Sequence, residues 1–149
     1  MSDNSEQQLK RYVLDSYAVL AYLKQEAGYE IVLNRIEETK KGKNRLFMNL
    51  FNLGEVLYIV ERERGLFAAQ EVLALIDELP VIMELADREL TLAAAHLKAQ
   101  YPIAYADCFA VALAQQKGAT LISGDPDFEK VAEVVALEWL PKRNSYDIR

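Results

Sequence analysis

Four acidic residues lie next to apolar segments, where a charged carboxylate is unexpected. Asp15 follows a short apolar run, and Asp125 follows another such run in the turn Ser-Gly-Asp-Pro-Asp. Glu55 and Asp107 lie in stretches whose neighbours at helical spacing are mostly apolar. Because burying an unpaired carboxylate is costly in free energy, each of these acids needs a cation or a hydrogen-bond donor close by.

Brought together, four carboxylates would repel one another and raise each other's pKa unless a cation held them. Oxygen-only ligands favour a hard ion, Mg²⁺ or Mn²⁺, over zinc. Such an ion keeps bound waters and contacts phosphate oxygens, which suits metal-assisted hydrolysis of a phosphodiester. The pattern therefore favours an acidic metal site in which the metal-binding and catalytic residues are Asp15, Glu55, Asp107 and Asp125.

Each acid also has a purely structural explanation. Asp15 and Asp125 can cap helices, and Gly-Asp-Pro-Asp is ordinary turn chemistry. Asp107 can satisfy the start of a helix and its dipole. Glu55 can pair with Arg62, which lies two helical turns further along the chain. Taken singly, the four positions leave these alternatives open.

Alternating strands and helices must position the acids. Short apolar runs predict strands at 11–14, 46–48, 81–85, 120–122 and 134–137. Amphipathic and apolar stretches predict helices at 17–23, 29–40, 50–64, 66–78, 87–100, 104–117 and 128–132. This alternation predicts an α/β fold of three layers, a central mostly parallel sheet of about five strands flanked by helices. In such folds ligands bind beyond the carboxyl ends of the strands, where Asp15 and Asp125 are expected.

The composition fits a single globular domain. The chain has 149 residues, 52% of them hydrophobic, which allows a substantial core and argues against disorder. One Cys and one His exclude a disulfide framework, a cysteine zinc site and a mechanism with two imidazoles. The net charge of −6 argues against a uniformly basic surface for binding nucleic acid. It does not exclude a nuclease, because a metal-binding cluster of acids itself lowers the net charge.

The chain ends suggest short tails. Residues 1–8 are polar and predicted to be flexible, the domain is expected over 9–141, and 142–149 is expected to be a C-terminal tail. No secretory signal and no apolar run of transmembrane length are apparent. An unpaired cysteine without an export signal fits a reducing compartment, so we expect a cytoplasmic protein without membrane association.

Four segments in order resemble the PIN-domain ribonucleases, and among them the VapC-type toxins of toxin–antitoxin pairs. The segments are 12–16, 52–56, 105–114 and 120–128. The resemblance covers about residues 10–140 and implies a PIN-like fold. It identifies the same four acids as the family's acidic quartet, adds Asp127 as a further metal contact, and finds Ser123 where the family more often has Thr. The neighbouring polar residues expected to support the acids are Ser16, Asn52 and Ser123.

The resemblance also implies a function. Family members are typically Mg²⁺- or Mn²⁺-dependent endoribonucleases that use metal-activated water and leave 5′-phosphate and 3′-hydroxyl ends. It implies a toxin of a type II toxin–antitoxin system, with RNA as substrate, a cognate antitoxin protein that holds it inactive, and a homodimer. Basic residues that are candidates for RNA-phosphate contacts are Lys40, Lys41, Lys43, Arg45 and Arg62. The alternative for these is a solvated loop and an exposed helix end.

Two other functions remain compatible with the pattern. One is a non-catalytic binding module of PIN-like fold, which is favoured if no metal binds. The other is a different Mg²⁺-dependent phosphoryl hydrolase, such as a phosphatase or a receiver-type domain. Those enzymes need a lysine near a phosphorylated aspartate, and the turn after the fourth predicted strand contains none. A P-loop motif is also absent from the sequence.

Overall fold

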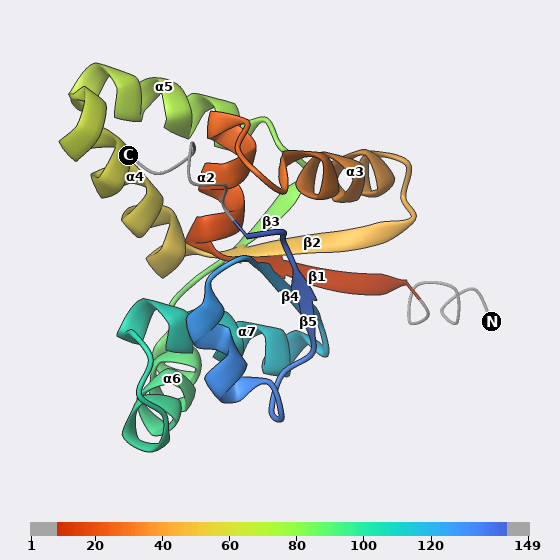
Figure 1. Ribbon diagram of the computed structural model, residues 1–149, viewed down its shortest axis with the longest axis vertical. Helices are drawn as coiled ribbons and strands as arrows, with labels where there is room; N and C mark the ends of the chain where they lie inside the picture. Colours follow the sequence, from red (N-terminus) through yellow and green to blue (C-terminus); the bar gives the residue numbers. More distant parts are fainter. Residues whose placement is uncertain (1–8, 143–149) are drawn as a thin grey trace.

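A central parallel sheet organises the molecule, as the computed structural model shows for the described residues 9–142 (Figure 1). Its five strands are ordered β3-β2-β1-β4-β5, and every neighbouring pair is parallel. The strands are β1 (Lys10–Leu14), β2 (Asn44–Asn49), β3 (Val81–Glu84), β4 (Thr120–Ser123) and β5 (Leu137–Trp139). The predicted flexible segment 1–8 and, apart from Lys142, the predicted tail 142–149 lie outside the described residues.

Helices cover both faces of the sheet, which confirms the predicted three-layer α/β fold. Four of them pack on one face, and α6, α7 and the short 3₁₀ helix η1 pack on the other (Figure 1). The four on the first face are α2 (Ser16–Lys24), α3 (Tyr29–Lys40), α4 (Leu50–Arg64) and α5 (Leu66–Asp77). Those on the second face are α6 (Arg88–Gln100), α7 (Tyr105–Lys117) and η1 (Pro126–Val131).

Successive side chains of a central strand point to opposite faces of the sheet, which explains why the core has two halves. Val13 and Leu121 belong to the cluster under α6 and α7, whereas their neighbours Leu14 and Ile122 belong to the cluster under α2 to α5. All four side chains are buried. Strands covered on both faces have no solvent side, so they appear in the sequence as continuous apolar runs.

The order in which strands are added to the sheet reverses between β1 and β4. From β1 the chain adds β2 and then β3 on one side, and it then returns to add β4 and β5 on the other. Leu14 and Ile122 are register partners, so the residues after the two strands leave the sheet side by side. In open parallel sheets this reversal point creates a crevice at the carboxyl edge, where ligands bind.

The last strand lies later in the chain than predicted. Apolar residues suggested a strand over 134–137, but β5 is Leu137–Trp139 and residues 132–135 form turn and bend. Val135 is buried in the core beneath η1 although it forms no strand. Leu137 pairs instead with Leu121 of β4, so pairing with β4, and not the start of the apolar run, sets the strand's limits.

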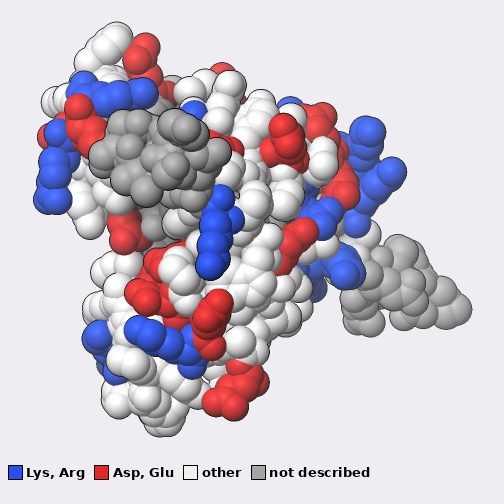
Figure 2. Space-filling view, in the orientation of Figure 1, with Lys and Arg blue, Asp and Glu red and all other residues white. Residues whose placement is uncertain are grey.

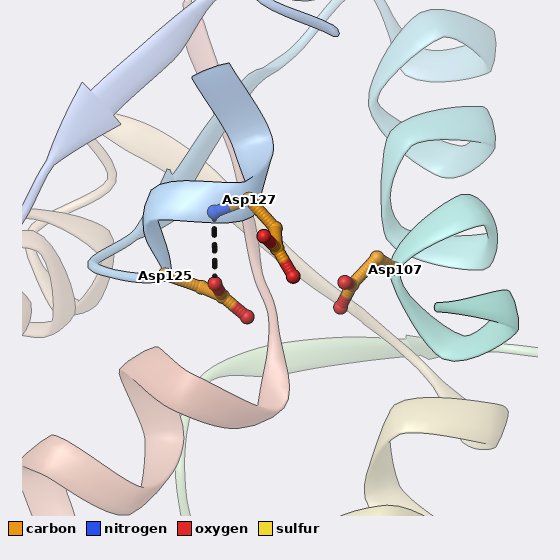
Figure 3. A group of neighbouring side chains, drawn as sticks. All are labelled: Asp107, Asp125 and Asp127. Carbon is orange, nitrogen blue, oxygen red and sulfur yellow. Dashed lines mark hydrogen bonds between the residues drawn. The ribbon is translucent and has the colours of Figure 1, made fainter. Parts of the chain in front are cut away.

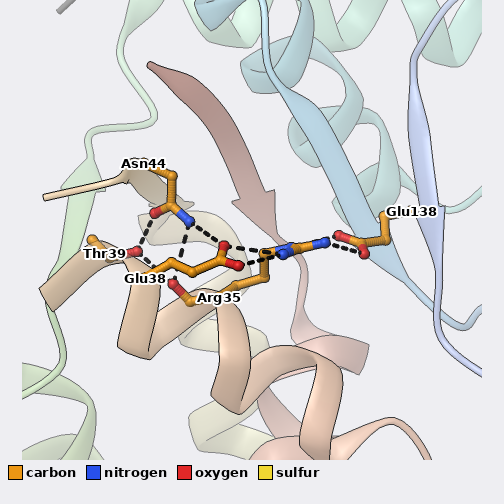
Figure 4. A network of polar contacts seen from close by, with 5 residues as sticks. All are labelled: Arg35, Glu38, Thr39, Asn44 and Glu138. Carbon is orange, nitrogen blue, oxygen red and sulfur yellow. Dashed lines mark hydrogen bonds and ion pairs between the residues drawn. The ribbon is translucent and has the colours of Figure 1, made fainter. Parts of the chain in front are cut away.

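An ionic network fastens α3 to β5 (Figure 4). The guanidinium of Arg35 donates two hydrogen bonds to Glu138, at 2.6 and 2.9 Å, and also binds Glu38. Arg35 lies 4.8 Å above the ring of Tyr12 in β1. Glu38 in turn accepts a hydrogen bond from Asn44 at the start of β2. The network therefore joins α3 to three strands.

No helix among the described residues combines the length and the apolar character that crossing a lipid bilayer would require.

Candidate metal centre

Asp15 joins the first strand to the first helix and is buried, with 3% of its surface exposed. Its Oδ1 accepts a hydrogen bond from the backbone N–H of Ala18 at 2.8 Å, so the residue caps α2. Burial raises the pKa of Asp15 to about 7, helped by the charges of Asp107 and Asp125 and opposed by hydrogen bonds from Ser123 and Ala18. Asp15 thus caps a helix, as the structural explanation required. Capping alone does not explain why its carboxyl group lies close to Asp107 and Asp125.

The loop after β4 presents two further acids. The Oγ of Ser123 accepts a hydrogen bond from the Asp125 N–H at 3.0 Å, and Asp125 accepts one from the Asp127 N–H at 2.9 Å. These bonds fold the loop back on itself and start η1. Gly124 is needed here because an added Cβ would lie 2.4 Å from the ring of Tyr17.

Asp107 lies in the first turn of α7 and is partly buried. Burial is the main reason that the pKa of Asp107 rises to about 7, and the negative charges of Asp125, Glu55 and Asp127 raise it further. A backbone hydrogen bond at Ala104 acts in the opposite direction. The carboxyl group is therefore held in a place where charge is disfavoured unless a cation compensates it.

Three of the acids converge at the carboxyl edge of the sheet. Asp107, Asp125 and Asp127 each offer a carboxylate oxygen, and these oxygens all lie within 4.8 Å of one another. Figure 3 shows them pointing toward one another, Asp107 from α7 and the other two from the start of η1. In Figure 2 acidic side chains gather on this face, where η1 lies. A group of carboxylate oxygens at this spacing is suited to a hard divalent cation.

A polar stripe on α4 completes one wall of the centre. Asn49 caps α4 by accepting a hydrogen bond from Phe51, and Asn52 donates one to the Ala106 carbonyl of α7 at 3.1 Å. Asn49, Asn52 and Glu55 recur at three-residue spacing, and each has a buried side-chain atom without a hydrogen-bond partner among the described residues. Buried polar atoms are normally satisfied, so the Oδ1 of Asn52 and the Oε1 of Glu55 fit a water or a cation between α4 and α7, whereas the Nδ2 of Asn49 is a donor and fits a water.

Arg62, which the structural explanation made the ion-pair partner of Glu55, interacts with a different residue. Its guanidinium stacks over the ring of Tyr58 at 5.1 Å. The Oε1 atom of Glu55 remains without a partner among the described residues, and its negative charge acts on Asp107. Glu55 therefore interacts electrostatically with Asp107, whereas Arg62 lies two turns further along α4.

The other predicted phosphate-binding residues lie at the opposite edge of the sheet. Lys40 ends α3, Lys41 and Lys43 belong to the connection between α3 and β2, and Arg45 is the second residue of β2. Parallel strands share one starting edge, so this basic group is a strand's length away from the acids. Figure 2 shows basic side chains near the meeting of α3 and β2, apart from the acidic face. Ser16, also predicted at the site, opens α2 directly after Asp15.

Two residues near the centre were not singled out by the sequence. Lys130 forms an ion pair with Asp127 at 3.4 Å, with about half of each side chain exposed. Tyr17 packs its ring against Gly124. The spacing of Lys130 after Asp127, three residues in a short helix, was a visible signal for the ion pair.

The fold is shared with several solved structures. VapBC2 from Rickettsia felis, bound to a DNA fragment from its promoter, has a TM-score of 0.72 at 18% identity, covering 88% of this chain and 99% of that one. DNA-bound VapBC from Salmonella typhimurium gives 0.69 at 16%, covering 88% and 98%. Mycobacterium tuberculosis VapC20, a sarcin–ricin loop cleaving toxin, gives 0.66 at 16%, covering 89% and 99%. At these identities the likeness establishes a common fold.

Sequence comparison supplies the family. No curated protein shows significant similarity to the chain. The PIN domain family model, in contrast, matches residues 12–134. Because that match spans well over half of the chain and contains every acid at the sheet edge, the chain belongs to the PIN domain family.

Proposed function

We propose that this protein is a metal-dependent endoribonuclease and the toxin of a type II toxin–antitoxin pair. The observation that carries the proposal is the meeting of Asp107, Asp125 and Asp127, whose carboxylate oxygens lie within 4.8 Å of one another. Membership of the PIN domain family supports the same function. The solved structures of similar fold include VapC20, described as a toxin that cleaves the sarcin–ricin loop.

Each acid has a proposed role. Asp15, Glu55 and Asp107 hold the principal ion, which we propose to be Mg²⁺ or Mn²⁺, while Asp125 and Asp127 contribute from the η1 side. When bound, the ion lowers the pKa of a water and offsets charge on the phosphate. Ser123 keeps the Asp125 loop in place through its hydrogen bond. Asn52 fixes the distance between α4 and α7 by binding the Ala106 carbonyl.

A protein partner is part of the proposal. Several solved structures of this fold are VapBC complexes or are described as toxin–antitoxin complexes. A groove of about 420 Å³ beside Glu55 is lined by apolar side chains of α4 and by Ala106, which suits an apolar segment of an antitoxin. We further propose a cytoplasmic homodimer, and light scattering on the purified chain tests the dimer. The buried free thiol of Cys108 is in keeping with that compartment.

The decisive experiment is RNA cleavage with matched variants. Total RNA and a defined single-stranded RNA are incubated with the protein and Mg²⁺ or Mn²⁺, with and without a chelator. We expect metal-dependent cuts that are lost with the chelator and in Asp107→Asn. Asp87→Asn is the control, because it makes the same chemical change at the cap of α6 and keeps an oxygen to accept the Leu90 N–H. Cleavage by Asp107→Asn at the wild-type rate would remove this residue from the mechanism.

Metal binding can be tested without activity. A ligand bound only by the folded state raises the melting temperature. We expect Mn²⁺ to raise it for the wild type and Asp87→Asn, and to raise it much less for Asp107→Asn. An unchanged melting temperature at saturating Mn²⁺, together with intact RNA, would favour the non-catalytic binding module.

A further inference from the structure

A hollow beside the acidic loop is separate from the metal centre. It has a volume of about 310 Å³ and is lined by Gly124, Pro126, Glu129, Trp139, Leu140, Pro141 and Lys142. Gly124 and Pro126 flank Asp125, so the loop that presents this acid forms one wall. The opposite wall is the end of β5. The size is at the lower limit for pockets that accept small organic groups, about 300 Å³.

The position of Trp139 follows from the sheet. Trp139 is the register partner of Ser123, and the Leu140 N–H binds the Ser123 carbonyl at 2.9 Å. The end of β5 is therefore fixed against the strand that leads into the acidic loop. Trp139 nevertheless keeps 39% of its surface exposed, although a side chain of this size gains much by burial.

The lining has the chemistry of a nucleobase site. An indole beside proline rings offers a flat apolar surface, and aromatic side chains bind bases by stacking without requiring a particular sequence. Lys142 is exposed at the same hollow and supplies a positive charge near a wall of acids. Glu129 offers a carboxylate that can accept a hydrogen bond from a base amino group.

We propose that this hollow is a subsite for one nucleobase of the RNA strand, with Trp139 stacking on the base and Lys142 contacting the neighbouring phosphate. The inference rests on the proposed ribonuclease function and adds the place where the strand is held next to the cut. The base subsite fixes where the neighbouring nucleotide lies relative to the metal centre, whichever base it carries. Trp139 is thus a positioning residue that orients the substrate.

The single tryptophan makes the subsite directly observable, because all tryptophan emission from the chain comes from Trp139. The full chain carrying Asp107→Asn, with Mn²⁺ present, is titrated with a short single-stranded RNA of mixed sequence. An abasic sugar-phosphate oligomer of equal length is the phosphate-only probe. We expect the RNA to quench the emission and the abasic oligomer to leave it unchanged.

Variants measure how much the stacking contributes. Anisotropy of labelled RNA should show affinity about 5- to 150-fold weaker for Trp139→Ala, the range known for base–aromatic stacking. Trp139→Phe should retain most of the affinity because it keeps an aromatic ring. Phe67→Ala removes an aromatic side chain that is 74% exposed on α5, and it should leave affinity unchanged. Lys142→Ala should lower the dependence of affinity on salt by about one charge.

The outcomes separate the subsite from the proposed function. RNA that is bound or cut while tryptophan emission stays constant and Trp139→Ala keeps full affinity overturns the subsite alone. RNA that is neither bound nor cut by the wild type overturns the proposed function and the subsite with it. The emission experiment uses the native side chain, so it decides the question even if Trp139→Ala fails to fold.

Discussion

Replacing Asp15 by Asn should stabilise the metal-free protein, and most strongly at alkaline pH. The carboxyl group is buried among other acids, and its pKa rises from 3.8 to about 7 on folding. The folded chain therefore keeps a proton that the unfolded chain releases between these two values. The stabilising contribution of that proton is fully present below pH 3.8 and is lost as the pH rises through about 7.

The magnitude follows from the size of the shift. At 1.36 kcal/mol for each pKa unit, the Asp15 carboxyl group costs the folded wild type about 4 kcal/mol at about pH 8, where it is charged, and about 2 kcal/mol at about pH 5.5, where folding requires it to take up a proton. Asn resembles the protonated acid, and its oxygen can still accept the Ala18 N–H that caps α2. The variant should therefore gain about 4 kcal/mol at the higher pH and about half of that at the lower.

The assay is urea denaturation in the presence of a chelator at the two pH values. A gain of about 4 kcal/mol corresponds to a rise in melting temperature of about 8–16 °C for a chain of this size. Asp87→Asn serves as the control, because Asp87 is exposed and caps α6 in the same manner. An Asp15→Asn protein no more stable than the wild type at about pH 8 would refute the reasoning. So would a gain that does not change with pH.

Three further predictions follow from other parts of the molecule. Stabilisation by Mn²⁺, measured as a melting-temperature shift, should be smaller at about pH 6 than at about pH 8, because the two acids with raised pKa values then hold protons; an equal shift would exclude their part in binding. Gly124→Ala should cost about 1–3 kcal/mol in chemical denaturation, since its Cβ would lie 2.4 Å from Tyr17, and adding Tyr17→Leu should recover part of the loss. Arg35→Met leaves Glu138 unpaired and should cost about 1–3 kcal/mol, whereas Lys24→Met, which breaks a more exposed pair, should cost less than about 1 kcal/mol by the same measurement.

Much of the fold was predictable because its elements carry strong local signals. The helix predicted from Leu50 to about Arg64 is confirmed as α4, since Asn49 caps its start and Gly65 ends it. β5 was misplaced because its limits depend on pairing with β4, which no local pattern encodes. Trp139 consequently did not stand out as a residue at the carboxyl edge.

The site shows that structural and functional explanations of an acid do not exclude each other. Asp15 and Asp125 both cap helices, as the structural alternative required; in addition, the charge of Asp125 raises the pKa of both Asp15 and Asp107. The position of the basic loop 40–45 was available from the sequence, because residues before a parallel strand lie at the edge opposite to those after it. That inference needs only the strand direction.

The switch in strand order between β1 and β4 has a consequence during synthesis. The acids that interact near the sheet edge come from positions as far apart as 15 and 127, and β5, which closes the sheet beside them, ends at Trp139. A growing polypeptide on the ribosome therefore carries its first acids long before it can assemble them. A metal centre built from these acids therefore cannot form on the ribosome before the segment up to residue 127 has been synthesised and has left the exit tunnel.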